Sequence, residues 1–344
     1  MTGTGASLLT VRDLHSYLAT GQGVVRAVDG VSFTLHEAEV LGIVGESGCG
    51  KTVTCRTIMG LMPARLVHTD GEVIYHPHGE QNLLRAPESE LRSIRGSHLA
   101  MIFQDPMTAL NPVLSIGDQL IEAVRAHNRC PAAEARTRAI GLLDRVGIPA
   151  ADRRMRDYPF QFSGGMLQRA LIAIALASSP RLLLADEPTT SLDVIIQDQI
   201  LSLLLELQED TGMSLILVSH DLAVISEMCD RIIVMYAGQV VEEGAAADVI
   251  TAPRHPYTRA LLEALPHAES RGQLRSISGS PPSLIDVPPG CRFEPRCRLA
   301  TPECLSWQTE LLAAGEREHG ARCWRHEEIA EGRDTWEPSD SASA

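Results

Sequence analysis

The sequence predicts an α/β fold built on a mostly parallel sheet, and three observations lead to this prediction. Continuous apolar runs of strand length occur at residues 40–44 and 181–185, as in strands that are buried on both faces. Elsewhere apolar residues recur with helical spacing, so strands and helices alternate along the chain. A mainly helical stretch from about 106 to 178 interrupts the alternation and predicts an inserted helical subdomain.

Two segments near the start of the chain have a different pattern. Apolar and polar residues alternate at 8–14 and 31–35, which predicts half-buried strands of an antiparallel β-subdomain. The remaining strands are expected at residues 99–103, 214–219 and 231–235. The helices are expected at residues 51–61, 116–146, 194–208 and 257–265.

We expect the chain to divide into a main domain, an extension and a tail. The main domain covers residues 1–265, and no internal repeat is visible in it. Prolines between 281 and 289 mark a stiff, irregular linker within a C-terminal extension over 266–327. The polar residues 328–344 are expected to form a disordered tail.

Composition limits the possible functions. The 344 residues carry a formal net charge of −14, which argues against broad nucleic-acid binding, because such binding needs clustered Lys and Arg. No run of about 18 apolar residues occurs, so no membrane-spanning helix is expected. Residues 1–7 lack the basic start and apolar stretch of a secretory signal. We therefore expect a cytosolic protein.

A glycine-rich motif follows the apolar run at 40–44. Residues 45–52 read GESGCGKT and fit the pattern G-x-x-x-x-G-K-S/T, in which glycines let successive backbone N–H groups point at phosphates. The following helix adds its positive N-terminal end. We expect Lys51 to reach the β- and γ-phosphates of ATP and Thr52 to place its hydroxyl on Mg²⁺. The residues expected to bind ATP here are Gly45, Glu46, Ser47, Gly48, Cys49, Gly50, Lys51 and Thr52.

Two acidic residues follow the second apolar run. Asp186 and Glu187 come directly after residues 181–185, and the carboxyl end of a parallel strand is where such sheets bind ligands. We expect Asp186 to hold Mg²⁺ and Glu187 to orient or deprotonate an attacking water. Alone, two adjacent acids often form a solvated loop. Together with the glycine-rich motif, they indicate ATP hydrolysis.

Four further motifs resemble those of ABC transporter ATPases. Residues 162–169 (FSGGMLQR) resemble the ABC signature, usually LSGGQ. Gln104, residues 191–193 (SLD) and His220 resemble the Q-loop, the D-loop and the switch histidine. All occur in the order typical of that family. The resemblance implies a P-loop NTPase core with a helical subdomain, an antiparallel β-subdomain and a small Cys-rich C-terminal extension.

The resemblance also implies a site shared by two subunits. Two cassettes would close head to tail around two ATP molecules, so that the signature of one subunit caps ATP held by the other. Glu187 would act with Gln104 and His220, and Gln104 would also contact Mg²⁺. The other residues implied to contact ATP are Ser163, Gly164, Gly165 and Asp193. Met166 stands where the family usually has Gln, and no ligand role is assigned to it.

A finer resemblance involves segments outside the nucleotide motifs. The segments that resemble ATPases of dipeptide/oligopeptide importers are 101–112, 186–193, 235–244, 253–265 and 289–297. This implies a peripheral ATPase at the cytoplasmic face of the inner membrane that powers peptide import. The implied partners are a second ABC ATPase (a paralogue rather than an identical copy), two membrane permease subunits and an extracytoplasmic peptide-binding protein, without nucleic acid. A related branch carries nickel, so import of nickel or another small solute is the alternative.

Four cysteines near the end of the chain form a separate candidate site. Cys291, Cys297, Cys304 and Cys323 are spaced C-x5-C-x6-C-x18-C. In a cytosolic chain such a group suggests metal binding before disulfides. Four thiolates can hold a 4Fe–4S iron–sulfur cluster or a structural Zn²⁺. The family resemblance favours the iron–sulfur cluster; zinc, and free or disulfide-bonded cysteines, are the alternatives.

A few residues have two interpretations or only a structural one. Tyr17 is the nearby upstream candidate for stacking on adenine, and a surface tyrosine is the alternative. Cys49 is expected to fill space rather than to act as a nucleophile, with enough solvent access for oxidation. His255, His267 and His326 are expected on the surface.

Two other classes of function were weighed against the importer ATPase. A soluble ABC protein acting on nucleic acid usually carries two cassettes or long coiled-coil inserts, and this chain has neither. The second class is a regulatory module that uses the cassette as a nucleotide switch. The cysteine-rich tail permits this function but does not require it. The peptide importer ATPase is therefore the favoured prediction.

Overall fold

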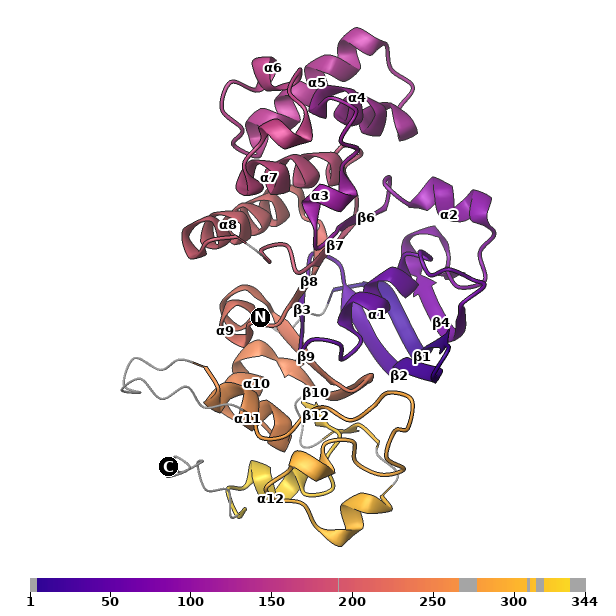
Figure 1. The fold of residues 1–344 in the computed structure, drawn as a ribbon, viewed down its shortest axis with the longest axis vertical. Helices are drawn as coiled ribbons and strands as arrows, with labels where there is room; N and C mark the ends of the chain where they lie inside the picture. Colours follow the sequence, from indigo (N-terminus) through magenta and orange to yellow (C-terminus); the bar gives the residue numbers. More distant parts are fainter. Residues whose placement is uncertain (1–4, 191, 266–276, 308–309, 314–318, 335–344) are drawn as a thin grey trace.

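The fold is described from a computed structural model, which covers residues 5–190, 192–265, 277–307, 310–313 and 319–334. These residues form an eight-stranded sheet and a four-stranded sheet, with a group of helices at one end of the molecule (Figure 1). Within the described ranges, no helix is long and apolar enough to cross a membrane.

The eight-stranded sheet is the centre of the molecule. In spatial order its strands are β11 (Leu312–Ala313), β12 (Gly320–Ala321), β10 (Gln239–Ala245), β9 (Arg231–Tyr236), β3 (Val40–Val44), β8 (Ser214–Ser219), β7 (Leu182–Asp186) and β6 (Leu99–Ile102). The neighbours from β9 to β6 are parallel, whereas β10, β12 and β11 pair antiparallel. The predicted α/β fold with a mostly parallel sheet is confirmed.

Each face of this sheet packs into its own hydrophobic core. Along β3, Val40 and Val44 belong to one core, and Leu41 and Ile43 belong to the other. The first core includes α8 (Val194–Thr211), and the second includes α1 (Lys51–Ile58) and the antiparallel sheet. Because both faces are covered, the central strands read as continuous apolar runs.

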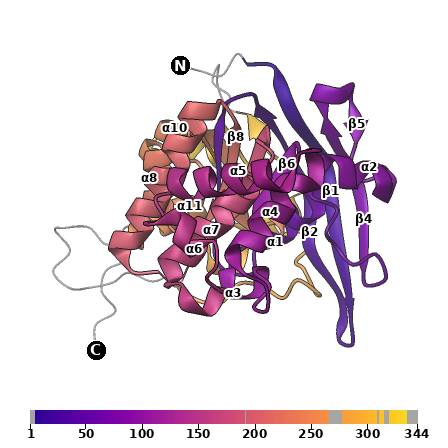
Figure 2. The ribbon, with the colours of Figure 1, turned by 90° about the horizontal axis from the view of Figure 1, so that it is seen from above.

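The four-stranded sheet forms a separate layer over α1. Its order is β2 (Gly23–His36), β1 (Ser7–Thr20), β4 (Val67–Tyr75) and β5 (Gln81–Asn82). Figure 2 shows it at one side of the molecule, away from α8, α10 (Ala246–Thr251) and α11 (Pro256–Glu263). The predicted antiparallel β-subdomain is therefore present, with longer strands than the alternating pattern alone indicated.

The inserted helices lie between β6 and β7. They are α3 (Pro106–Ala109), α4 (Ile116–His127), α5 (Ala132–Arg145), α6 (Ala151–Arg154), the 3-10 turn η2 (Pro159–Gln161) and α7 (Gly164–Ala175). The continuous helix predicted over 116–146 is divided in two, because Pro131 is the N-cap of α5 and cannot continue α4. Ser115 caps α4 by accepting the N–H of Asp118.

Several shorter elements have no strong periodic signal and were missed. They are η1 (His76–His78), α2 (Glu88–Ile94), α9 (Leu222–Met228), β4, β5, β10 and α10. β4 (VHTDGEVIY) carries four residues in its first half that are polar or glycine and mostly exposed, so its apolar alternation begins only at Val73.

The C-terminal extension packs on the main domain. Its elements are η3 (Glu294–Arg296), η4 (Pro302–Leu305), β11, β12 and α12 (His326–Ala330). Disorder from residue 328 is a wrong expectation as far as Asp334, because α12 crosses that boundary and Asp334 forms an ion pair with Arg259 at 2.8 Å. Residues 266–276, including His267, and residues 335–344 lie outside the described residues.

Candidate active site

The loop between β3 and α1 has a backbone that glycine alone allows at several positions. Gly48 and Gly50 have φ angles of 79° and 109°, in the left-handed region. A Cβ on Gly50 would lie 2.2 Å from the carbonyl oxygen of Ala27. The curve of the loop therefore depends most on Gly50, and a glycine-rich curve of this kind suits a chain of phosphates.

Lys51 begins α1 and lies inside the curve of the loop. Its ammonium donates to the carbonyl oxygens of Gly45 at 2.7 Å and Glu46 at 3.1 Å. It also lies 3.8 Å from Oε1 of Glu187, and only 4% of the side chain is exposed. The charge is thus held at the junction of the loop and the acidic pair.

Asp186 ends β7 and is fully buried. Its Oδ1 accepts a hydrogen bond from the Thr52 hydroxyl at 2.8 Å, while Oδ2 has no partner among the described residues. Burial raises the pKa of this carboxyl above its ordinary value. An unpartnered carboxylate oxygen beside a threonine hydroxyl is a donor set that fits Mg²⁺.

Glu187 gathers the other predicted catalytic side chains. Its Oε2 accepts from Gln104 Nε2 at 2.8 Å and from Thr190 Oγ1 at 2.9 Å, and it lies 3.8 Å from His220 Nδ1. These residues meet because Gln104, Glu187 and His220 follow β6, β7 and β8, which are adjacent in the sheet. Thr190 is not among the catalytic residues predicted from the sequence, because a TT pair in this position is not distinctive.

The backbone of Glu187 is unusual. Its φ angle of 47° lies in the left-handed region, which is strained for a residue with a side chain. Its N–H donates to the carbonyl oxygen of Val218 on the neighbouring strand at 3.1 Å, which holds the turn. The side chain is 13% exposed, so the carboxylate can meet both solvent and the buried charges.

The signature segment starts a helix rather than contacting the loop. Ser163 is the N-cap of α7, and its hydroxyl accepts the N–H of Met166 at 3.4 Å. Asp193 likewise caps α8 by accepting the N–H of Ile196 at 3.0 Å, and a Cβ on Gly165 would lie 2.8 Å from the Ile196 side chain. α7 lies with the helical group, away from α1 beside the four-stranded sheet (Figure 1). Ser191 of the D-loop lies outside the described residues.

Comparison with known proteins agrees with this arrangement. The family model described as "ABC transporter" matches residues 28–190. The chain is 45% identical to the dipeptide transport ATP-binding protein DppD of Bacillus subtilis over 94% of this chain and 96% of that protein. It is 49% identical to DppD of Escherichia coli K12 over 90% of this chain and 95% of that one.

The chain belongs to the ABC transporter ATPase family. It is the type of subunit that hydrolyses ATP. A dimeric structure of the ATP-binding cassette MJ0796 with ADP and phosphate has a TM-score of 0.62 and 28% identity, covering 69% of this chain and 98% of that one. A second model, described as the C-terminal region of oligopeptide/dipeptide transporters, matches residues 241–304.

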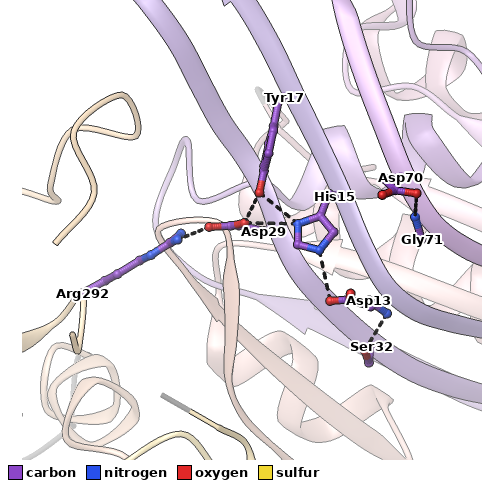
Figure 3. Close-up of polar contacts among 8 residues, drawn as sticks. All are labelled: Asp13, His15, Tyr17, Asp29, Ser32, Asp70, Gly71 and Arg292. Carbon is purple, nitrogen blue, oxygen red and sulfur yellow. Dashed lines mark hydrogen bonds and ion pairs between the residues drawn. The ribbon is translucent and has the colours of Figure 1, made fainter. Parts of the chain in front are cut away.

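Tyr17 of this ABC ATPase is tied into a polar network. Its hydroxyl donates to Asp29, which also binds His15 and Arg292 (Figure 3). Burial, with the hydrogen bond to Asp29, raises the pKa of Tyr17 to about 12. The guanidinium carbon of Arg26 lies 5.9 Å from the centre of its ring. The ring is thus fixed on β1 of the antiparallel sheet, and its stacking on adenine stays a prediction.

Three expectations about exposure are wrong. Cys49 is only 4% exposed, because the loop folds over it, and burial raises the pKa of its thiol. The predicted solvent access of Cys49 is therefore absent. His255 and His326 are 1% and 8% exposed instead of lying on the surface, and burial lowers the pKa of His255 to about 3.

The four cysteines of the extension line one small cavity. Its walls also include Phe293, Trp307 and Trp324, and its volume is about 20 Å³. Burial raises the pKa of Cys297 and of Cys323 to about 12. Among the described residues, no group of three or more His, Cys, Asp or Glu side chains is placed to hold a metal ion.

Proposed function

We propose that this ABC ATPase powers the import of di- or oligopeptides across the cytoplasmic membrane. The related proteins of B. subtilis and E. coli are named dipeptide transport ATP-binding proteins, and the match of the C-terminal region to the oligopeptide/dipeptide family supports the same cargo class. Nickel or another small solute is the alternative cargo. The assignment of ATP hydrolysis rests on one observation: Lys51 and Thr52, where α1 begins, contact Glu187 and Asp186, where β7 ends.

The roles of the residues follow from these positions. The N–H groups of the loop and Lys51 would bind the β- and γ-phosphates. Thr52 and Asp186 would hold Mg²⁺, with Gln104 nearby; the ion supplies charge neutralisation for the phosphates. Glu187 would accept a proton from water as the water oxygen forms a bond to the γ-phosphorus. The bond from that phosphorus to the β-γ bridging oxygen breaks, giving ADP and phosphate.

The hydrogen bonds of Glu187 support its proposed role as the base. Gln104 and Thr190 donate to the same oxygen, Oε2, which leaves Oε1 facing Lys51 at 3.8 Å. The carboxylate would thus be oriented before water arrives. His220, which follows β8, lies 3.8 Å from Oε2 of Glu187 and would contact the γ-phosphate.

The complete site would need two ATPase subunits. Ser163, Gly164 and Gly165 present the N-terminal end of a twelve-residue helix, and Ser163 and Gly164 are exposed. Such an end attracts phosphate oxygens. We infer that this end caps ATP bound by the other subunit, with Asp193 beside it, and that a paralogous ATPase, two permease subunits and an extracytoplasmic peptide-binding protein complete the assembly at the membrane's inner face.

Two variants test the assignment. Lys51→Ala is expected to abolish hydrolysis, and unchanged hydrolysis would refute the phosphate loop.

Glu187→Gln keeps the shape of the side chain but removes the base, so hydrolysis should fall about 10²-fold or more while an ATP-bound dimer accumulates. Near-normal turnover of Glu187→Gln would remove Glu187 as the base.

A second proposal concerns the cysteines of the extension. All four line one cavity, and we propose that they hold a 4Fe–4S cluster, with a structural Zn²⁺ as the alternative. The cluster would link segments of the extension, whose own apolar core is small. Anaerobic purification with iron, sulfide and zinc analysis tests this; zinc without iron would refute the cluster.

A further inference from the structure

The C-terminal extension contacts the phosphate loop through one ion pair. Arg296 lies in the turn between Cys291 and Cys297, and its guanidinium donates twice to the carboxylate of Glu46, at 2.6 and 3.0 Å. The exposed fraction is 3% for the Arg296 side chain and 27% for Glu46. A bidentate, mostly buried pair has a fixed geometry and is weakly screened by salt.

Arg296 is itself held in place. Its Nε donates to the carbonyl oxygen of Ser278 at 3.0 Å, and its Nη1 lies 3.2 Å from the hydroxyl of Tyr236. The guanidinium also lies over the rings of Tyr236 and Phe293, at 5.7 and 5.9 Å from their centres. The position of its charge is thus set by the main domain and the extension together.

Glu46 is the part of the loop on which these contacts converge. Its N–H donates to the hydroxyl of Tyr257 at 2.9 Å, its carbonyl oxygen accepts from Lys51 at 3.1 Å, and its carboxylate binds Arg296. The carboxylate therefore belongs to the same residue whose carbonyl contacts the ammonium that would bind phosphates. An unpaired negative charge at this position would repel a polyphosphate.

We propose that Arg296 is a positioning residue of the ATP site, which acts by neutralising Glu46. The extension then supplies a charge that the loop needs for strong ATP binding. This inference rests on the proposed function, because it takes residues 45–52 as the phosphate site. It does not depend on what the cysteines bind.

The first test measures ATP affinity of the full-length chain with Mg²⁺ by calorimetric titration. Arg296→Met should raise the Kd for ATP about tenfold, because it leaves the Glu46 carboxylate unpaired. The deficit should shrink as salt is raised, and Arg296→Lys, which keeps the charge, should recover most of the affinity. Arg298→Met is the matched control. Arg298 follows Cys297 in the same extension but pairs with Glu263, at 3.5 Å, instead of with Glu46. Arg298→Met should leave the Kd unchanged.

The second test separates charge from a merely structural brace. Glu46→Gln breaks the same ion pair without leaving a negative charge, so it should raise the Kd far less than the tenfold expected for Arg296→Met. In the Glu46→Gln background, Arg296→Met should no longer weaken binding. If Arg296→Met does not fold, the Glu46→Gln result decides alone.

A tenfold or larger rise in the Kd of Glu46→Gln, an unchanged Kd for a folded Arg296→Met, or an Arg296→Met effect that persists in the Glu46→Gln background would each overturn the proposal. Lys51→Ala distinguishes the two levels of inference. If Lys51→Ala leaves ATP binding and hydrolysis intact, the phosphate-loop assignment itself fails. If Lys51→Ala loses ATP binding or hydrolysis but the Arg296 variants bind ATP as the unaltered chain does, the phosphate-loop assignment stands and the role of Arg296 is refuted.

Discussion

At the scale of single residues, Asp186 shows a conflict between stability and function. The carboxyl is fully buried, one oxygen has no partner among the described residues, and burial raises its pKa. An acid whose pKa is raised by folding binds more protons in the folded state than in the unfolded state. Asp186 therefore lowers the free energy of unfolding as the pH rises from 3.8, the ordinary pKa of the carboxyl, through the higher pKa that it has in the folded protein.

This conflict predicts opposite effects of Asp186→Asn on stability and activity. The neutral amide keeps an acceptor for Thr52 but removes the buried charge, so the melting temperature in Mg²⁺-free buffer near pH 7 should rise by about 2 °C. Mg²⁺-dependent hydrolysis should fall about 10²-fold or more, because an anionic ligand is lost. Thermal melting and an ATPase assay check both, with Asp193→Asn as a surface control for melting. A lower melting temperature would contradict the assigned cost of burial.

At the scale of elements, the extension is anchored to two parts of the main domain. Arg292, which is 6% exposed, donates to Asp29 on β2 (Figure 3). It also donates to the carbonyl oxygen of Ala237 in the turn between β9 and β10. Glu242 on β10 is fully buried and accepts from His319 at 2.7 Å. Burial alone would raise the pKa of Asp29, but hydrogen bonds from Tyr17 and Arg292 hold it below its usual range. These contacts join segments that are far apart in the sequence.

Loss of this anchor should destabilise the protein far more than loss of a surface pair. Arg292→Met leaves Asp29 charged and half-buried, at a cost of about 3 kcal/mol, or a fall in melting temperature of about 6 °C. Arg12→Met in the same antiparallel sheet is the control, because its pair with Glu72 is exposed and is worth less than about 1 kcal/mol. Equal melting temperatures for the two variants would show that the Arg292 pair is no anchor. The difference between Arg292→Met and the unaltered chain should narrow below pH 3.8, where Asp29 in the unfolded chain binds a proton.

At the scale of the whole molecule, the two halves of the proposed ATP site lie apart within one subunit. The phosphate loop follows β3, whereas the signature begins α7 in the helical group (Figure 1). A closed dimer with two-fold symmetry would place each signature against the loop of the other subunit.

This arrangement predicts that two inactive chains can restore each other. Lys51→Ala keeps the signature, and Ser163→Arg keeps the loop, so a mixed dimer has one intact site. If the chain pairs with itself, mixing equal amounts should recover about a quarter of the activity, since half of the dimers are mixed and each has one of two sites. The ATPase rate of each variant alone is the control. If the mixture stays as inactive as its components, the composite site within a homodimer is excluded.

The positions of most residues of the candidate catalytic centre could be predicted from the sequence, because the motifs mark the ends of strands. Gln104, Glu187 and His220 each follow an apolar run, and adjacent parallel strands deliver such residues to one edge of a sheet. The contacts of the extension could not be predicted. Arg296 and Glu46 are separated by 250 positions, and Arg296 lies in an irregular turn without periodicity. The burial of Cys49, His255 and His326 depends on the same long-range packing.

One consequence arises from the short strand β12. It pairs with Glu242 and Glu243 on the side of β10 that does not face β9. A chain ending near residue 265 would keep every nucleotide motif but would leave this side of β10 open. Open strand edges recruit other chains, so such a truncated cassette should self-associate instead of remaining dispersed. In the full chain, the extension covers this part of the edge of β10.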